Sequence, residues 1–202
     1  MLCGIDEAGR GPLAGPVCAA SVILCDNFSL PSLDDSKKLN AKVREELKTL
    51  ICERSFAWGL GWASPGEIDT INIHKAVLLA MKRAFYSMLD TAGNAADFAA
   101  GELNESEIRV VVDGLFTPDI SASCQAVVKA DSKVPAVMAA SILAKTARDR
   151  LMEHYALFYP EYGYDKHKGY PTKAHRQAIA IYGPSAIQRL SFRGGETGKE
   201  DR

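Results

Sequence analysis

From residue 55 to residue 63, every second residue is large and apolar and the residues between are small. This period of two predicts a β-strand, with Trp58 and Trp62 on one face and packed into the core. Four further short apolar segments, bounded by turn residues or acids, are also predicted strands: residues 2–6, 17–25, 108–112 and 125–129. The chain therefore supplies five strands for a sheet.

Apolar residues recur every three or four positions in other parts of the chain, which indicates helices with one buried face. The predicted helices cover residues 41–54, 73–89, 134–155 and 173–182. Asn40 and Thr172 are suitable N-caps, and Ser64 with Glu67 has the spacing of a capping box. Because strands and helices alternate, we expect an α/β or mixed α+β fold with a central sheet.

The remaining segments are predicted loops. Residues 26–39 are polar, and residues 159–170 are aromatic and basic. Residues 92–107 are rich in alanine and acids, which indicates a mobile surface insertion. Residues 194–202 are predicted to be a disordered tail. We therefore expect one domain over residues 1–193.

The composition is that of an average globular protein: 202 residues, 47% hydrophobic, 24% charged, with a net charge of −1. It excludes wholesale disorder and a positive field over the whole molecule. No apolar run reaches the ~20 residues that span a bilayer, and the first ten residues lack a basic region, so we expect a cytoplasmic protein without a membrane segment. The five cysteines form no C-x-x-C pair and are interpreted as buried, reduced thiols.

Four acids lie at or just after the ends of predicted strands. They are Asp6, Glu7, Asp113 and Asp131. Strand ends that lie side by side in one sheet would bring these carboxylates together. Carboxylates at such distances repel one another and take up protons unless a cation neutralises them. Hard divalent cations prefer oxygen ligands, and such a site suits two-metal phosphoryl chemistry.

A glycine-rich turn follows the first two acids directly. In Gly9-Arg10-Gly11, glycine lets backbone N–H groups approach a ligand, and arginine can grip a phosphate. The competing interpretation is a dinucleotide-binding fingerprint. Its glycine spacing is one residue too long, and Pro12 interrupts the position where the phosphate-binding helix should start.

Local charge favours a polyanionic substrate. Residues 145–193 contain nine basic and four acidic residues, interleaved with Tyr159, Tyr162, Tyr164 and Tyr170. Basic and aromatic side chains in this arrangement suit contacts with phosphates, bases or sugars. The four histidines show no zinc spacing. Ser141 and Lys145 are not spaced as a Ser-x-x-Lys nucleophile motif, so the serine is predicted to face the core.

Four blocks of the chain closely resemble the ribonuclease HII family. The first, residues 4–17 (GIDEAGRGPLAGPV), is highly specific. Three others follow in the same order: residues 34–39 (DDSKKL), residues 138–145 (MAASILAK) with residues 148–150 (RDR), and residues 168–172 (KGYPT). Ala130 and Leu115 depart from the glycine and asparagine that the family often has beside its acids.

The resemblance implies a ribonuclease H-like fold, which is a mixed central sheet flanked by helices with a helical C-terminal region. The activity it implies is endonucleolytic hydrolysis of the RNA strand of RNA/DNA hybrids. It also implies cutting on the 5′ side of ribonucleotides embedded in duplex DNA, which leaves 3′-hydroxyl and 5′-phosphate ends. The four acids would be catalytic ligands of Mn²⁺ or Mg²⁺.

The resemblance also assigns the substrate contacts. Residues Gly9, Arg10 and Gly11 would sense the ribose 2′-hydroxyl, which distinguishes RNA from DNA. Tyr170 would pack on the sugar at the RNA–DNA junction, and Lys37 and Lys145 would contact substrate or support the site. We expect a monomer without an obligate protein partner. The alternative is a non-catalytic nucleic-acid binding module on the same fold, against which the intact set of acids argues.

Overall fold

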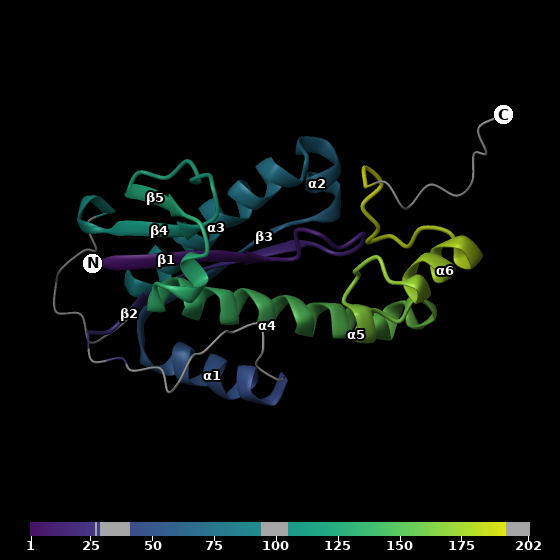
Figure 1. The fold of residues 1–202 in the computed structure, drawn as a ribbon, viewed down its shortest axis with the longest axis horizontal. Coiled ribbons are helices and arrows are strands. Elements are labelled where there is room, and N and C mark those ends of the chain that lie inside the picture. The colour runs from purple at the N-terminus through teal and green to yellow at the C-terminus, as the bar shows by residue number, and fades with distance from the viewer. Residues whose placement is uncertain (27, 29–40, 94–104, 193–202) are drawn as a thin grey trace.

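The computed structural model of the chain describes residues 1–26, 28, 41–93 and 105–192. Its centre is one five-stranded sheet with the strand order β3-β2-β1-β4-β5 (Figure 1). Strand β1 pairs antiparallel with β2, which pairs antiparallel with β3, whereas β1–β4 and β4–β5 are parallel. The strands are β1 Leu2–Ala8, β2 Val17–Leu24, β3 Ser55–Ala63, β4 Arg109–Asp113 and β5 Ser123–Val127. The predicted mixed sheet is confirmed.

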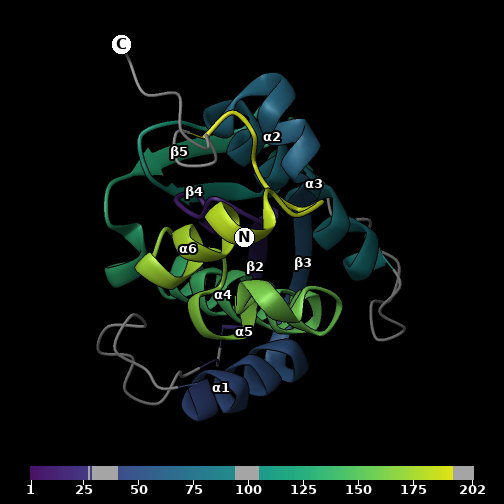
Figure 2. The same cartoon turned by 90° about the vertical axis from the view of Figure 1, so that its right-hand side faces the viewer.

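Helices cover both faces of this sheet (Figure 2). Helix α3 packs on one face, and α4 packs on the other with α1 on its outer side. The helices are α1 Ala41–Arg54, α2 Pro65–Ile71, α3 Ile73–Gly93, α4 Pro135–Phe158, α5 Tyr164–His167 and α6 Lys173–Tyr182. Single 3₁₀ turns η2, η3 and η4 cover Glu105–Glu107, Ala130–Ser132 and Pro160–Tyr162.

Strand alternation divides the core into two layers. In β2, Val17 and Ala19 face the cluster beneath α3, while Cys18 and Ala20 face the cluster beneath α4. The small residues of β3 let α3 approach closely, because a Cβ atom on Gly61 would lie 2.1 Å from the carbonyl oxygen of Ala80. The small residues of β3 therefore lie on the face that α3 covers, and its tryptophans lie on the opposite face.

A third cluster joins the two ends of the chain. Leu13 and Ala14, from the connection between β1 and β2, pack with Tyr162, Tyr164 and Ile187 of the C-terminal region. Ala14 also forms an isolated antiparallel bridge with Gln188. The C-terminal helices in Figure 1 therefore pack against the connection between β1 and β2.

Most predicted elements are confirmed, and α1, β3 and α6 have the predicted bounds. The Ser64 capping box is present, and Trp58 and Trp62 are half-buried against the cluster under α4. Helix α3 continues to Gly93, so the expected insertion at 92–107 begins inside a helix. The expectation of a plain loop at 159–170 is wrong, because this segment contains η4 and α5.

Other expectations concern residues that the structure does not describe. Lys37, the cap Asn40, most of the 26–39 loop, residues 94–104 and the tail at 194–202 lie outside the described residues. All five cysteines are free thiols, but only Cys3 and Cys18 are buried, so the prediction of buried thiols is wrong for the exposed Cys25. No helix in the described ranges has the length and apolar character needed to cross a bilayer.

Candidate functional site

Three of the predicted acids meet where β1 and β4 end. Because Ile5 pairs with Val112 in these parallel strands, the next residues, Asp6 and Asp113, lie side by side. Asp131 joins them from η3. One carboxylate oxygen from each of the three lies within 4.8 Å of the others. Asp6 and Asp131 are buried, and Asp113 is half-buried.

Local backbone geometry places Asp131. After β5, Lys129 adopts a left-handed conformation with φ of 57°, which turns the chain into η3. The backbone N–H of Ala130 then donates a 2.8 Å hydrogen bond to Asp113 Oδ1. Ala130 itself has no positive φ, so alanine fits where the family often has glycine. This departure from the family therefore leaves the site geometry intact.

The carboxylates raise one another's proton affinity. Burial and the neighbouring Glu7 charge hold the pKa of Asp6 well above its ordinary value, although hydrogen bonds from Ser141 and the Glu7 backbone oppose this. Burial also raises the pKa of Glu7, against the opposing Arg10 charge. Such a cluster needs protons or a cation to neutralise it. Three clustered oxygen donors fit a hard divalent cation.

Glu7 lies differently from the other acids. As the neighbour of Asp6 on a strand, its side chain leaves on the opposite face, and it is not among the three residues whose oxygens cluster. It lines the same cavity of about 480 Å³ as the three aspartates. It also lines a second cavity of about 170 Å³ with His74 and Phe116.

The larger cavity also brings together the other described residues that the sequence analysis singled out. Its lining includes Gly9, Arg10, Gly11, Lys145 and Tyr170. The Tyr170 ring lies beside the turn, because a Cβ atom on Gly11 would be 3.7 Å from its Cε1 atom. Tyr170 is 41% exposed, so part of this residue is available to a ligand.

Two residues of this cavity were missed or misread from the sequence. Ser141 was predicted to face the core, but it is half-buried, lines the cavity and hydrogen-bonds Asp6. Its position one helical turn before Lys145 in α4 was the available signal. Arg44 of α1 also lines the cavity, and nothing in its sequence context distinguished it from a surface arginine.

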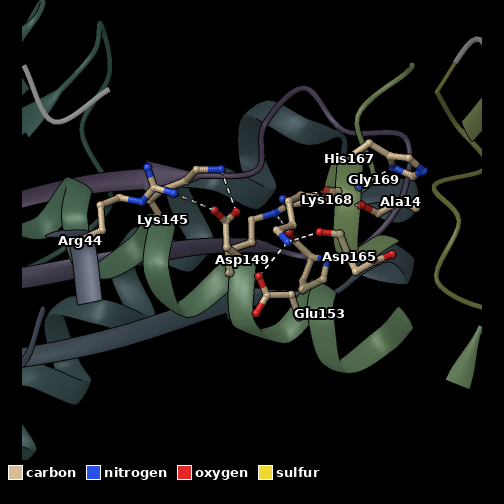
Figure 3. A network of polar contacts seen from close by, with 11 residues as sticks. Ala14, Arg44, Lys145, Asp149, Glu153, Asp165, His167, Lys168 and Gly169 are labelled. Atoms are coloured by element: carbon tan, nitrogen blue, oxygen red, sulfur yellow. Dashed lines mark hydrogen bonds and ion pairs between the residues drawn. The ribbon is translucent and has the colours of Figure 1, made fainter. Parts of the chain in front are cut away.

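Basic side chains beside the cavity are held in a polar network (Figure 3). Asp149 accepts a 2.7 Å hydrogen bond from Lys145 Nζ and lies 3.7 Å from Arg44 Nη2. Further along α4, Lys168 Nζ donates to Glu153 at 2.8 Å. The Lys145 ammonium lies 6.0 Å from the centre of the Tyr170 ring. Lys145 is therefore held between Asp149 and the ring of Tyr170.

Several residues expected to contact phosphates or bases are buried instead. Arg148 and Arg189 are 1% and 0% exposed, and both donate to backbone carbonyls. Tyr162 and Tyr164 belong to the third cluster and stack with ring centroids 5.5 Å apart. Only part of the basic and aromatic segment can therefore meet a substrate, with Tyr170 as its exposed aromatic residue at the cavity.

Comparison with known proteins gives consistent matches. The family model described as Ribonuclease HII matches residues 3–194. A ribonuclease HII from Treponema denticola is 54% identical over 95% of this chain and 98% of its own length.

Solved structures match the fold. Ribonuclease HII of Archaeoglobus fulgidus, solved as a complex with PCNA, has a TM-score of 0.69 at 27% identity and covers 94% of this chain and 92% of its own. Bst-RNase HIII in complex with Mn²⁺ has a TM-score of 0.67 at 18% identity, over 96% of this chain and 67% of its own. These likenesses confirm the fold class predicted from the sequence.

Proposed function

The chain belongs to the ribonuclease HII family and is an endoribonuclease of the ribonuclease H type, and we propose that it depends on a divalent metal and cuts 5′ of ribonucleotides embedded in duplex DNA. On continuous RNA/DNA hybrids it cuts the RNA strand. Both reactions leave 3′-hydroxyl and 5′-phosphate ends. The observation that carries this proposal is the meeting of the three clustered aspartates and the glycine-rich turn in one cavity.

The acids are the proposed metal ligands. Asp6, Asp113 and Asp131 each offer one oxygen to a shared position, and Glu7 adds a fourth carboxylate from the cavity wall. Together these acids would hold Mn²⁺ or Mg²⁺, which would activate a water molecule and neutralise charge on the leaving 3′ oxygen. The Mn²⁺ complex of a ribonuclease HIII with the same fold supports this assignment.

The turn and the tyrosine are the proposed recognition elements. Gly9, Arg10 and Gly11 line the cavity beside the acids, where their backbone can meet the ribose 2′-hydroxyl. Tyr170, next to Gly11, packs on the sugar at the junction. Lys145 is close enough to the ring to contact the adjoining phosphate, and the role of Lys37 stays a prediction.

All of these groups come from one chain, so we propose a monomer as the working unit. The third cluster packs the connection between β1 and β2 against the C-terminal helices. We therefore propose one catalytic domain over residues 1–193.

The test is cleavage of a labelled DNA duplex that contains one ribonucleotide, beside an all-DNA duplex and a continuous hybrid. Reactions contain Mg²⁺, Mn²⁺ or a chelator. We expect metal-dependent cutting 5′ of the ribonucleotide, with the all-DNA duplex intact. Asp6→Asn should abolish cutting and retain binding, while Asp119→Asn, an exposed acid paired with Lys82, should cut normally. Binding by wild-type protein without cleavage would favour a non-catalytic module instead.

A further inference from the structure

Two buried arginines surround the glycine-rich loop, defined here as residues 9–16. Arg148 in α4 and Arg189 near the C-terminus are 1% and 0% exposed. Arginine is rarely buried without a carboxylate partner, because removing its charge from water is costly. Within the described residues, the two guanidinium groups form six hydrogen bonds, and all six go to backbone carbonyl oxygens: those of Ala14, Pro16, Lys168, Gly9, Arg10 and Gly15.

Arg189 fixes the two peptide units at the start of the loop. Its Nη2 atom donates to the Gly9 carbonyl at 2.6 Å, and its Nη1 atom donates to the Arg10 carbonyl at 3.1 Å. A trans peptide points its N–H opposite to its carbonyl, and the described peptide bonds are trans. The N–H groups of Arg10 and Gly11 therefore point away from the guanidinium group. No described residue accepts a hydrogen bond from either N–H.

Arg148 fixes the other end of the loop and joins it to Tyr170. It donates to Ala14 at 3.2 Å and to Pro16 at 2.9 Å. Its Nη1 atom donates at 3.0 Å to the carbonyl of Lys168, two residues before the tyrosine. One guanidinium group thus holds both the loop and the segment that carries Tyr170.

The side chain of Arg148 leaves room only for glycine at the start of the loop. Gly9 has φ of 96°, and a Cβ atom there would lie 2.0 Å from Arg148 Nε. The left-handed region favours glycine for backbone reasons alone. The arginine adds a second reason, because its side chain occupies the space where a Cβ atom would be. Loop and guanidinium therefore form one packed unit.

We propose that Arg148 and Arg189 are positioning residues for ribonucleotide recognition. They aim the Arg10 and Gly11 N–H groups and set the distance from the loop to Tyr170, so they determine the preference for ribose over deoxyribose. The acids do not depend on them, since none of the six carbonyls belongs to the residues that cluster for the metal. This inference rests on the proposed function, which assigns ribose recognition to this loop.

The test uses Arg148→Lys and Arg189→Lys, which keep the charge but lose the planar fork that binds several acceptors at once. The matched control is Arg150→Lys, on the same helix, whose exposed side chain pairs with Glu45. Binding of a duplex with one ribonucleotide and of the all-DNA duplex is measured in chelator. The kcat, the KM and the Mn²⁺ concentration for half-maximal rate are then measured on the cleavable duplex.

We expect each positioning variant to lose about tenfold of the binding preference for the ribonucleotide, the equivalent of about one hydrogen bond. The KM should rise, while the Mn²⁺ concentration for half-maximal rate stays within about twofold, which a general loss of structure would not produce. The Arg150 control should match wild type in every measurement.

The contrary outcomes are distinct. If wild-type protein prefers ribonucleotides and the folded lysine variants keep that preference, only the positioning role is overturned. If neither variant folds by circular dichroism, the arginines serve the fold and the positioning role is again overturned. If wild-type protein shows no ribonucleotide preference, the proposed function fails and the positioning role fails with it.

Discussion

Replacing Asp6 with asparagine should make the metal-free protein more stable at neutral pH, although it removes a proposed catalytic group. The asparagine oxygen can still accept the 2.7 Å hydrogen bond from the Glu7 backbone N–H. What the substitution removes is negative charge from the cluster. At an effective dielectric constant of about 20, two unit charges 4.8 Å apart repel by about 3.5 kcal/mol.

Asp6 takes part in two of the three pairs within the cluster. If all three aspartates were ionised, the two repulsions that involve Asp6 would destabilise the folded state by about 7 kcal/mol. Proton uptake limits this cost, since the pKa of Asp6 is raised by burial and by its acidic neighbours. If a quarter of this repulsion remains after proton uptake, its removal stabilises the asparagine variant by about 2 kcal/mol. For a chain of this size, that corresponds to a rise of about 4–8 °C in Tm.

The pH dependence has a definite sign. An acid with a raised pKa in the folded state costs nothing below its ordinary pKa of about 4 and costs more as the pH rises toward the folded-state pKa. The advantage of asparagine should therefore vanish toward pH 4 and be largest near pH 8. Calorimetry in chelator from pH 4 to pH 8 measures it, with Asp119→Asn as the exposed control.

Adding Mn²⁺ should reverse the order of stability. A cation at one hundred times its Kd stabilises the folded state by about 2.7 kcal/mol, and the variant lacks one of the three clustered ligands. A variant less stable than wild type at pH 8 in chelator would refute the repulsion argument. Equal stabilisation of both proteins by Mn²⁺ would refute the ligand assignment.

Three further changes have defined outcomes. Gly9→Ala places a Cβ atom 2.0 Å from a buried guanidinium group at a φ of 96°, so this variant should lose at least about 2 kcal/mol of unfolding free energy in a urea titration. The control Gly66→Ala has open space around it and should be neutral in the same titration. Tyr170→Ala should raise the KM about tenfold for a duplex with one ribonucleotide, while Tyr170→Phe keeps the ring and the wild-type KM, as steady-state kinetics will measure. Tyr164→Phe leaves the buried Ser185 hydroxyl without its 2.6 Å partner and should cost about 1–3 kcal/mol, read as a lower Tm in calorimetry; an unchanged Tm would contradict this estimate.

The sequence was most informative where local pattern and tertiary structure agree. The alternation in residues 55–63 marks a strand because each face of β3 meets a different helix. Asp6 and Asp113 could be placed together because parallel neighbours end at the same edge of a sheet. In both cases the contact depends on strand geometry, which the chain pattern encodes.

The failures concern contacts between distant segments. In the sequence, Arg148 and Arg189 are simply two of the basic residues in a positive region. Five of their six carbonyl partners lie more than 130 residues away in the chain, which no local pattern reports. Ser141 was misread because helical periodicity cannot say which neighbour the apolar face meets. The same limit hid η4 and α5, which the third cluster stabilises.

The contact between Arg189 and Gly9 also bears on the order of synthesis. The two residues are 180 positions apart, so the loop cannot acquire its final shape until Arg189 has left the ribosome. The three clustered aspartates are complete once residue 131 has been translated. The three aspartates can therefore all be present on the growing chain before the loop that we propose reads the sugar reaches its final shape.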